Sequence, residues 1–270
     1  MPAHTFTVDL IALFSIALYL ASAGALARPL LREGAAPRRI ALFTGCCAVI
    51  LHFAALLLAH RGSLDLHFFS ALSLVAAVIA ALTLIVNLAR PVAALAIILF
   101  PLAALFLAID EFLAPATAPF ALDWQIKLHV TIALLAYSLL AIAAVLALLL
   151  AAQERALRAR QFSGWARVLP PLTQTESLMF RLIAAGFALL TLTLLSGALF
   201  IQNLRAQHQA HTAILSVAAW IVFGVLLIGR WRWGWRGRSA VNLTLLGMIV
   251  LVLAFFGSKF VLELVLHRGL

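Results

Sequence analysis

The sequence predicts an all-α integral membrane protein: a polytopic helical bundle of about eight transmembrane helices with both termini outside. Of its 270 residues, 66% are hydrophobic and only 10% are charged, whereas a soluble domain carries about 25% charged residues. The apolar residues form long continuous runs, and a helix can satisfy its own backbone hydrogen bonds in lipid along such a run. The basic residues gather at every second end of these runs, which sets the direction of the helices.

Eight segments reach the roughly 20 apolar residues that a transmembrane helix needs. They cover residues 7–27, 40–59, 67–88, 91–110, 129–152, 178–201, 211–229 and 240–265. Most of the 19 lysines and arginines follow the first, third, fifth and seventh segments, and the positive-inside rule places those ends in the cytoplasm. No stretch outside the segments is long enough for a soluble domain, so we expect residues 1–270 to form one membrane domain.

The polar stretch before the sixth segment contains a helix-start signal. Pro170 and Pro171 interrupt any helix there, because proline lacks a backbone N–H and clashes with the preceding turn. Thr173 and Glu176 then have the spacing of a capping box. We predict that this box begins the sixth helix.

All eight histidines lie toward the outer side in this arrangement, and histidine is the side chain most often used to bind haem iron and metal ions. Most of them fall in outer loops, where a solvated role is the ordinary one. His52 lies inside the second segment, where an ionisable ring needs a partner or a function. His129 and His267 lie at the outer ends of the fifth and eighth segments. They therefore share one depth and can meet if these two helices are neighbours.

A polar stripe precedes the end of the chain. Lys259, Glu263 and His267 are spaced four apart, so they share one face of a helix. Such a stripe normally faces a cavity or the bundle interior, although a local Lys–Glu pair explains it equally well. Both interpretations stay open at this point.

The chain carries none of the usual enzyme motifs. It has no Walker sequence, no dinucleotide-binding glycine motif, no HExxH and no GxSxG. Histidines at the outer membrane edge suit an axial pair for haem, which needs apolar walls and polar groups for its propionates. We therefore predict a haem site without catalytic residues. The basic loops match an anionic membrane surface, so we do not expect nucleic acid as a partner.

Four stretches resemble the cytochrome c assembly membrane proteins, the CcsA/HemX-like group. They read KLHVTIALLAYSLL at 127–140, GFALLTLTLLSGALF at 186–200, AWIVFGVLLIGRWRWGWRGRSA at 219–240 and AFFGSKFVLELVLH at 254–267. The resemblance covers about residues 40–267 and is strongest from 127 onward. Within the group, the chain is most similar to short inner-membrane accessory proteins.

The resemblance implies roles for three histidines. His129 matches the first outer histidine that ligates haem iron in this family, and His267 matches the second. His52 is similar to a histidine in an early membrane span. The haem synthetases of the family carry a tryptophan-rich WWD loop, which would fall between Gly197 and His211. This chain has no tryptophan in that interval, so the aromatic platform that presents haem to an apocytochrome is absent.

These inferences together predict a multi-pass protein of the bacterial inner (cytoplasmic) membrane. We expect it to bind b-type haem non-covalently at its outer face and to assist cytochrome c assembly or haem handling. The iron ligands would be His129 and His267, with His52 at a second site. Its partners would be membrane lipid and cytochrome c maturation proteins. The alternatives are a transporter of haem or another small solute, and a cofactor-free membrane scaffold of an assembly complex.

Overall fold

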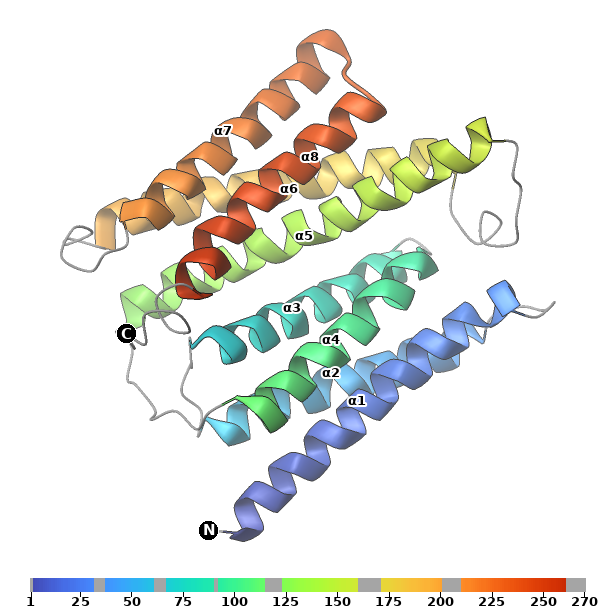
Figure 1. Cartoon of the computed structure of the whole chain (residues 1–270), viewed down its shortest axis with the longest axis vertical. Helices are drawn as coiled ribbons and strands as arrows, with labels where there is room; N and C mark the ends of the chain where they lie inside the picture. The colour runs from blue at the N-terminus through green and yellow to red at the C-terminus, as the bar shows by residue number, and fades with distance from the viewer. Residues whose placement is uncertain are drawn as a thin grey trace. The chain divides into compact units, whose positions relative to one another are not determined.

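The computed structural model describes residues 2–31, 37–60, 67–89, 92–114, 123–159, 171–200 and 210–260. These residues form eight helices and a π-helical turn (Figure 1). The elements are α1 (Pro2–Leu31), α2 (Arg38–Ala59), α3 (Phe68–Ala89), α4 (Ala93–Leu113), α5 (Trp124–Arg158), α6 (Leu172–Phe200), α7 (Ala210–Trp233), α8 (Arg238–Val252) and η2 (Leu253–Gly257). Within the described ranges, eight helices are long and apolar enough to cross a membrane. The predicted all-α membrane bundle is thus confirmed, while the outside position of both termini stays a prediction.

The described helices follow the predicted segments, but α1 and α6 extend several residues beyond them, as does α5, the longest described helix. It has 35 residues and extends beyond the predicted segment 129–152 at both ends. The sequence from Trp124 to Arg158 contains neither proline nor glycine, so nothing in it disfavours a helix where the apolar run ends. The hydrophobic run therefore defined the membrane portion of α5 but not the whole helix.

The predicted capping box at the start of the sixth helix is wrong. Helix α6 already begins at Leu172, and the backbone carbonyl of Pro171 accepts the amides of Gln174 and Thr175. Thr173 consequently lies within the first turn instead of preceding it. Pro171 explains the difference, since its fixed φ angle favours the start of a helix.

The described helices fall into two compact units, one holding α1–α4 and the other α5–α8 with η2. In unit 1, helix α1 packs against α2 and α4, and α3 packs against the same two helices. Unit 2 repeats this pattern, because α5 and α7 each pack against both α6 and α8. Each unit is thus a four-helix arrangement in which every helix has two main neighbours. The expectation of one membrane domain over residues 1–270 stays a prediction.

Small residues bring α1 and α2 of unit 1 close together. The hydroxyl of Ser15 donates to the Ala48 carbonyl at 2.8 Å, and that of Ser22 donates to the Ala41 carbonyl at 2.6 Å. Gly45 lies between the two alanines in sequence and faces the buried ring of Phe100 from α4. Small residues and hydroxyl groups are the usual means of joining helices in lipid, where the hydrophobic effect does not drive helix association.

Substitution of Gly45 with alanine is expected to destabilise unit 1. The added Cβ would lie 2.8 Å from the Phe100 ring and 3.1 Å from the Ser22 hydroxyl, so a packed ring would have to move. Overpacking of this kind costs about 1–3 kcal/mol. Gly24→Ala in α1 is the matched control, because its Cβ would meet nothing within 4 Å. Thermal unfolding in detergent should show a loss for Gly45→Ala alone; equal melting of both variants would contradict the packing described for α2.

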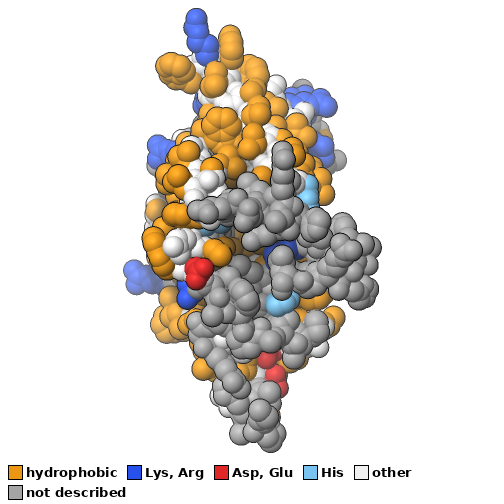
Figure 2. Space-filling view, turned by 90° about the vertical axis from the view of Figure 1, so that its left-hand side faces the viewer, with side chains coloured by type: hydrophobic (Ala, Val, Ile, Leu, Met, Phe, Trp, Pro, Cys, Tyr) orange, Lys and Arg blue, Asp and Glu red, His pale blue; other side chains and the backbone are white. Residues whose placement is uncertain are grey.

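The outer surface of the helices is largely apolar. Hydrophobic side chains dominate the described part of the face in Figure 2. Large exposed hydrophobics occur on helices of both units, such as Phe43 on α2, Ile85 on α3, Leu199 on α6 and Ile214 on α7. Such a surface is stable in lipid and would be unusual on a soluble monomer.

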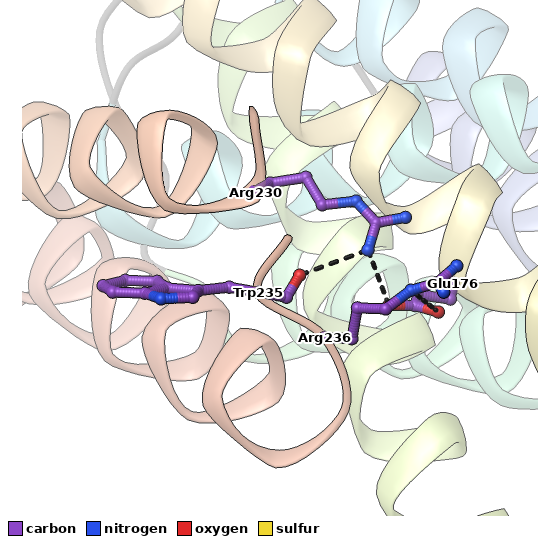
Figure 3. A network of polar contacts seen from close by, with 4 residues as sticks. All are labelled: Glu176, Arg230, Trp235 and Arg236. Atoms are coloured by element: carbon purple, nitrogen blue, oxygen red, sulfur yellow. Dashed lines mark hydrogen bonds and ion pairs between the residues drawn. The ribbon is translucent and has the colours of Figure 1, made fainter. Parts of the chain in front are cut away.

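A charge network joins α6 to the last turn of α7 and to the segment between α7 and α8 (Figure 3). The Glu176 carboxylate accepts from Arg230 at 3.3 Å and lies 3.5 Å from the Arg236 guanidinium. Arg230 also donates to the Trp235 carbonyl and lies 4.6 Å from the centre of the Phe180 ring. Glu176, which was expected in a capping box, therefore holds the arginine-rich end of unit 2 against α6.

Candidate functional site

The best candidate for a functional site in unit 2 is centred on His129, in the second turn of α5. Its Nδ1 atom lies 2.9 Å from the hydroxyl oxygen of Ser196 on α6. The imidazole is half-buried, whereas Ser196 is buried. The site thus lies between the start of α5 and the end of α6, two helices that pack against each other.

The hydrogen bonds of Ser196 favour one position for the proton of the His129 imidazole. The Ser196 hydroxyl donates to the Thr193 carbonyl at 3.0 Å, and a carbonyl oxygen can only accept. A hydroxyl has one proton to donate, so while that proton is on the Thr193 carbonyl, the Ser196 oxygen accepts from His129. In this arrangement Nδ1 carries the hydrogen, and Nε2 carries the lone pair of the ring. No described residue forms a hydrogen bond with Nε2.

Gly197 provides room for this ring. A Cβ atom at Gly197 would lie 3.2 Å from Cε1 of His129, which is closer than ordinary van der Waals contact. The missing side chain lets the imidazole lie directly against α6. In the sequence, this contact is indicated only by Ser196 followed by Gly197 near the end of a membrane span. That pair cannot be recognised as part of a site until the partner helix is known.

An aromatic pair lies one turn beyond His129. Trp124 of α5 and Phe200 of α6 meet edge to face, with ring centroids 6.2 Å apart. Phe200 follows Ser196 by four residues, so both lie on one face of α6. Trp124 is 67% exposed. An aromatic surface therefore borders the histidine, although the interval after Gly197 contains no tryptophan.

His52 of unit 1 has a different environment. It is fully buried, with Nδ1 lying 3.3 Å from the Tyr19 hydroxyl and Nε2 lying 3.0 Å from the Ser73 hydroxyl. Tyr19 also meets the imidazole edge to face, with ring centroids 5.8 Å apart. Both ring nitrogens thus have partners from neighbouring helices, as a polar ring within a membrane span requires.

The predicted site residues lie in different parts of the chain. His129 lies in unit 2 and His52 lies in unit 1, whereas His267 and Glu263 fall outside the described residues. Lys259 is buried just after the π-helical turn η2, with its Nζ 5.7 Å from the centre of the Phe255 ring. The proposed meeting of His129 and His267 therefore stays a prediction.

Comparison with known proteins identifies the family of this chain. The model of the cytochrome c assembly protein family matches residues 36–266, which is most of the chain. The chain belongs to the cytochrome c assembly protein family. The match begins and ends near the limits of about 40–267 expected from the sequence, and it includes His129 and His52.

Individual relatives of the family match about half of the chain. The inner membrane protein YpjD of Escherichia coli K12 is 39% identical over 137 residues, which are 51% of this chain and 52% of the relative. An uncharacterised 28.8 kDa protein of Azospirillum brasilense is 37% identical over 143 residues, 52% of this chain and 53% of that protein. The cytochrome c biogenesis protein CcsA of Guillardia theta is 26% identical over 164 residues, 54% of each chain. No solved structure matches.

The family and the eight candidate spans establish the cellular setting. This member of the cytochrome c assembly protein family is a multi-pass protein of the inner membrane. The matched region spans about half the length of these curated relatives.

Proposed function

We propose that this protein binds b-type haem non-covalently at its outer face and handles haem during cytochrome c assembly. The observation that carries the proposal is the contact between Nδ1 of His129 and the Ser196 hydroxyl, which leaves the Nε2 lone pair as the ligating atom. Histidines that bind metals usually donate the other ring N–H in this way, which fixes the tautomer and orients the ring. Membership of the cytochrome c assembly family supports haem as the ligand.

The residues around His129 fit the chemistry of a haem site. Trp124 and Phe200 offer apolar aromatic surface. When bound, haem would supply the iron that Nε2 of His129 ligates. The chain's own residues hold the imidazole in place, because Ser196 bonds Nδ1 and the backbone at Gly197 lies against one side of the ring.

We assign His267 as the second axial ligand on the resemblance of its sequence position. His52 is proposed only as a second site, since ligation there would require the Ser73 hydroxyl to leave Nε2. Because the interval after Gly197 lacks tryptophan, we propose haem holding or relay, with attachment left to other cytochrome c maturation proteins as partners.

An optical spectrum tests the proposed function. The full chain is expressed with haem supplied and purified in detergent, and its spectrum is recorded before and after reduction. A sharp, split pair of α and β bands on reduction is the expected result for a low-spin haem with two histidine ligands. A colourless protein would overturn the haem proposal and would favour the cofactor-free scaffold or the transport of another solute.

Removal of the Ser196 hydroxyl should weaken haem binding without removing a ligand. Ser196→Ala deletes the acceptor for the His129 Nδ1–H, and loss of such an outer-shell partner usually costs about 10–100-fold in metal affinity. Thr193→Val is the matched control, because that hydroxyl donates to the Leu189 carbonyl of its own helix. Haem titration of the apoprotein should separate the two variants, and equal affinities would argue against the assigned tautomer.

A further inference from the structure

At the arginine-rich end of unit 2, a cavity between α5 and α8 has no role in the proposed haem site. Its volume is about 350 Å³, at the lower end of the range of roughly 300–1,000 Å³ seen for small-molecule sites. The two helices pack against each other (Figure 1). All residues lining the cavity belong to unit 2.

Each helix contributes a regular face to the cavity. Helix α5 supplies Leu148, Ala151, Ala152 and Arg155, at positions i, i+3, i+4 and i+7. Helix α8 supplies Arg238, Val241, Asn242 and Leu245 with the same spacing. This spacing defines one face of a helix, so the cavity follows both helices for about two turns.

The polarity of the cavity changes along its length. Arg155 and Arg158 lie in the last turn of α5, and Arg238 is the first residue of α8. Leu148 and Leu245 each lie seven residues from the nearest of these arginines along their own helix, which is about 10 Å at 1.5 Å per residue. One end of the cavity is therefore cationic, and the end deeper in the span is apolar. Ala151 and Ala152 lie between the two ends, and their small side chains leave the space open.

The charge of the lining favours an anion. Three arginines face a single acidic residue, Glu154, whose carboxylate oxygen lies 3.0 Å from the Cβ position of Gly237. The first turn of α8 adds partial positive charge, because Gly237 supplies no side-chain cap for its backbone amides. Guanidinium groups bind phosphate oxygens with strong, often bidentate hydrogen bonds. A phosphate group is thus the chemistry that the cationic end accepts best.

We propose that this cavity binds the headgroup of an anionic phospholipid, with the phosphate at Arg155, Arg158 and Arg238. The apolar end favours a lipid over free phosphate, because Leu148 and Leu245 can contact the upper part of an acyl chain. Basic pockets between helices on the cytoplasmic side are typical sites for anionic lipids, and the arginine bias predicts that this end is cytoplasmic. The site is independent of haem and lies among residues that the haem proposal does not use.

Native mass spectrometry of the full-length protein tests the proposal. The detergent-solubilised chain is titrated with phosphatidylglycerol, and retained lipid is counted. The pocket variant Arg155→Gln/Arg158→Gln/Arg238→Gln should bind about 100-fold more weakly, at about fivefold for each arginine near an anionic lipid. The control variant Arg39→Gln/Arg181→Gln/Arg232→Gln loses the same charge at exposed positions outside the pocket, and it should keep affinity within about twofold.

Three outcomes would overturn the proposal: no lipid retained by the wild type, equal losses in the two triple variants, or displacement of the lipid by inorganic phosphate at equal concentration. The last outcome would assign the cavity to free phosphate. If the triple pocket variant does not fold, the single changes Arg155→Gln and Arg158→Gln answer the same question. Both side chains are exposed, and each change should weaken retention about fivefold.

Discussion

His129→Ala should abolish the low-spin haem spectrum of this protein. The substitution removes the Nε2 atom that we propose as the iron ligand, while Ser196, Gly197 and the aromatic pair remain. We therefore expect a loss of affinity larger than the roughly 10–100-fold expected when only an outer-shell partner is removed. Haem that stays bound should turn high-spin, with a broad band replacing the split α and β bands on reduction.

His211→Ala is the matched control for His129→Ala. This histidine also lies near an end of unit 2, in the first turn of α7, but it is exposed. Its removal should leave the spectrum unchanged. Spectra that change equally in both variants would show that the loss follows from general damage to unit 2, whereas a wild-type spectrum in both would refute the assignment of His129.

Removal of His52 should have the largest effect on the stability of unit 1. His52→Leu leaves the hydroxyls of Tyr19 and Ser73 without the ring nitrogens that they contact. Each buried polar group without a partner costs about 1–3 kcal/mol, so a total of about 2–5 kcal/mol is expected after partial relaxation. The loss of stability is measured by thermal unfolding in detergent. Light scattering or size-exclusion chromatography reports the fraction of protein that has unfolded at each temperature.

A triple variant gives the control for the His52 prediction. Tyr19→Phe/His52→Leu/Ser73→Ala removes both orphaned hydroxyls along with the ring, and replacing all partners by apolar groups can be nearly neutral. The triple variant should therefore melt closer to the wild type than His52→Leu does, and it should keep the haem spectrum of the His129 site. If His52→Leu alone melts like the wild type, the buried network does not stabilise unit 1.

Much of the fold could be predicted from the sequence, because the lipid imposes simple rules. Continuous apolar runs gave all eight helices, and the position of His52 within one of them correctly indicated a need for partners. The extra turns of α5 outside the apolar run and the start of α6 at Leu172 were not predicted, since hydropathy reports burial in lipid and not helix ends.

The candidate site was only partly predictable. His129 stood out by its depth and by its resemblance to the family. Ser196 lies 67 residues further along the chain, and no local pattern indicates that α5 and α6 bring the two side chains together. Tyr19 and Ser73 were missed as partners of His52 for the same reason. The cavity between α5 and α8 likewise required the pairing of two helices that are far apart in sequence.

Chemical rescue gives the most direct test of the claim that His129 ligates haem through Nε2. His129→Gly is purified with haem supplied, and its spectrum is recorded with and without free imidazole. The expected result is a high-spin or colourless protein that regains the low-spin α and β bands when imidazole occupies the space of the missing ring. A His129→Gly protein that keeps the wild-type low-spin spectrum without imidazole would contradict the claim.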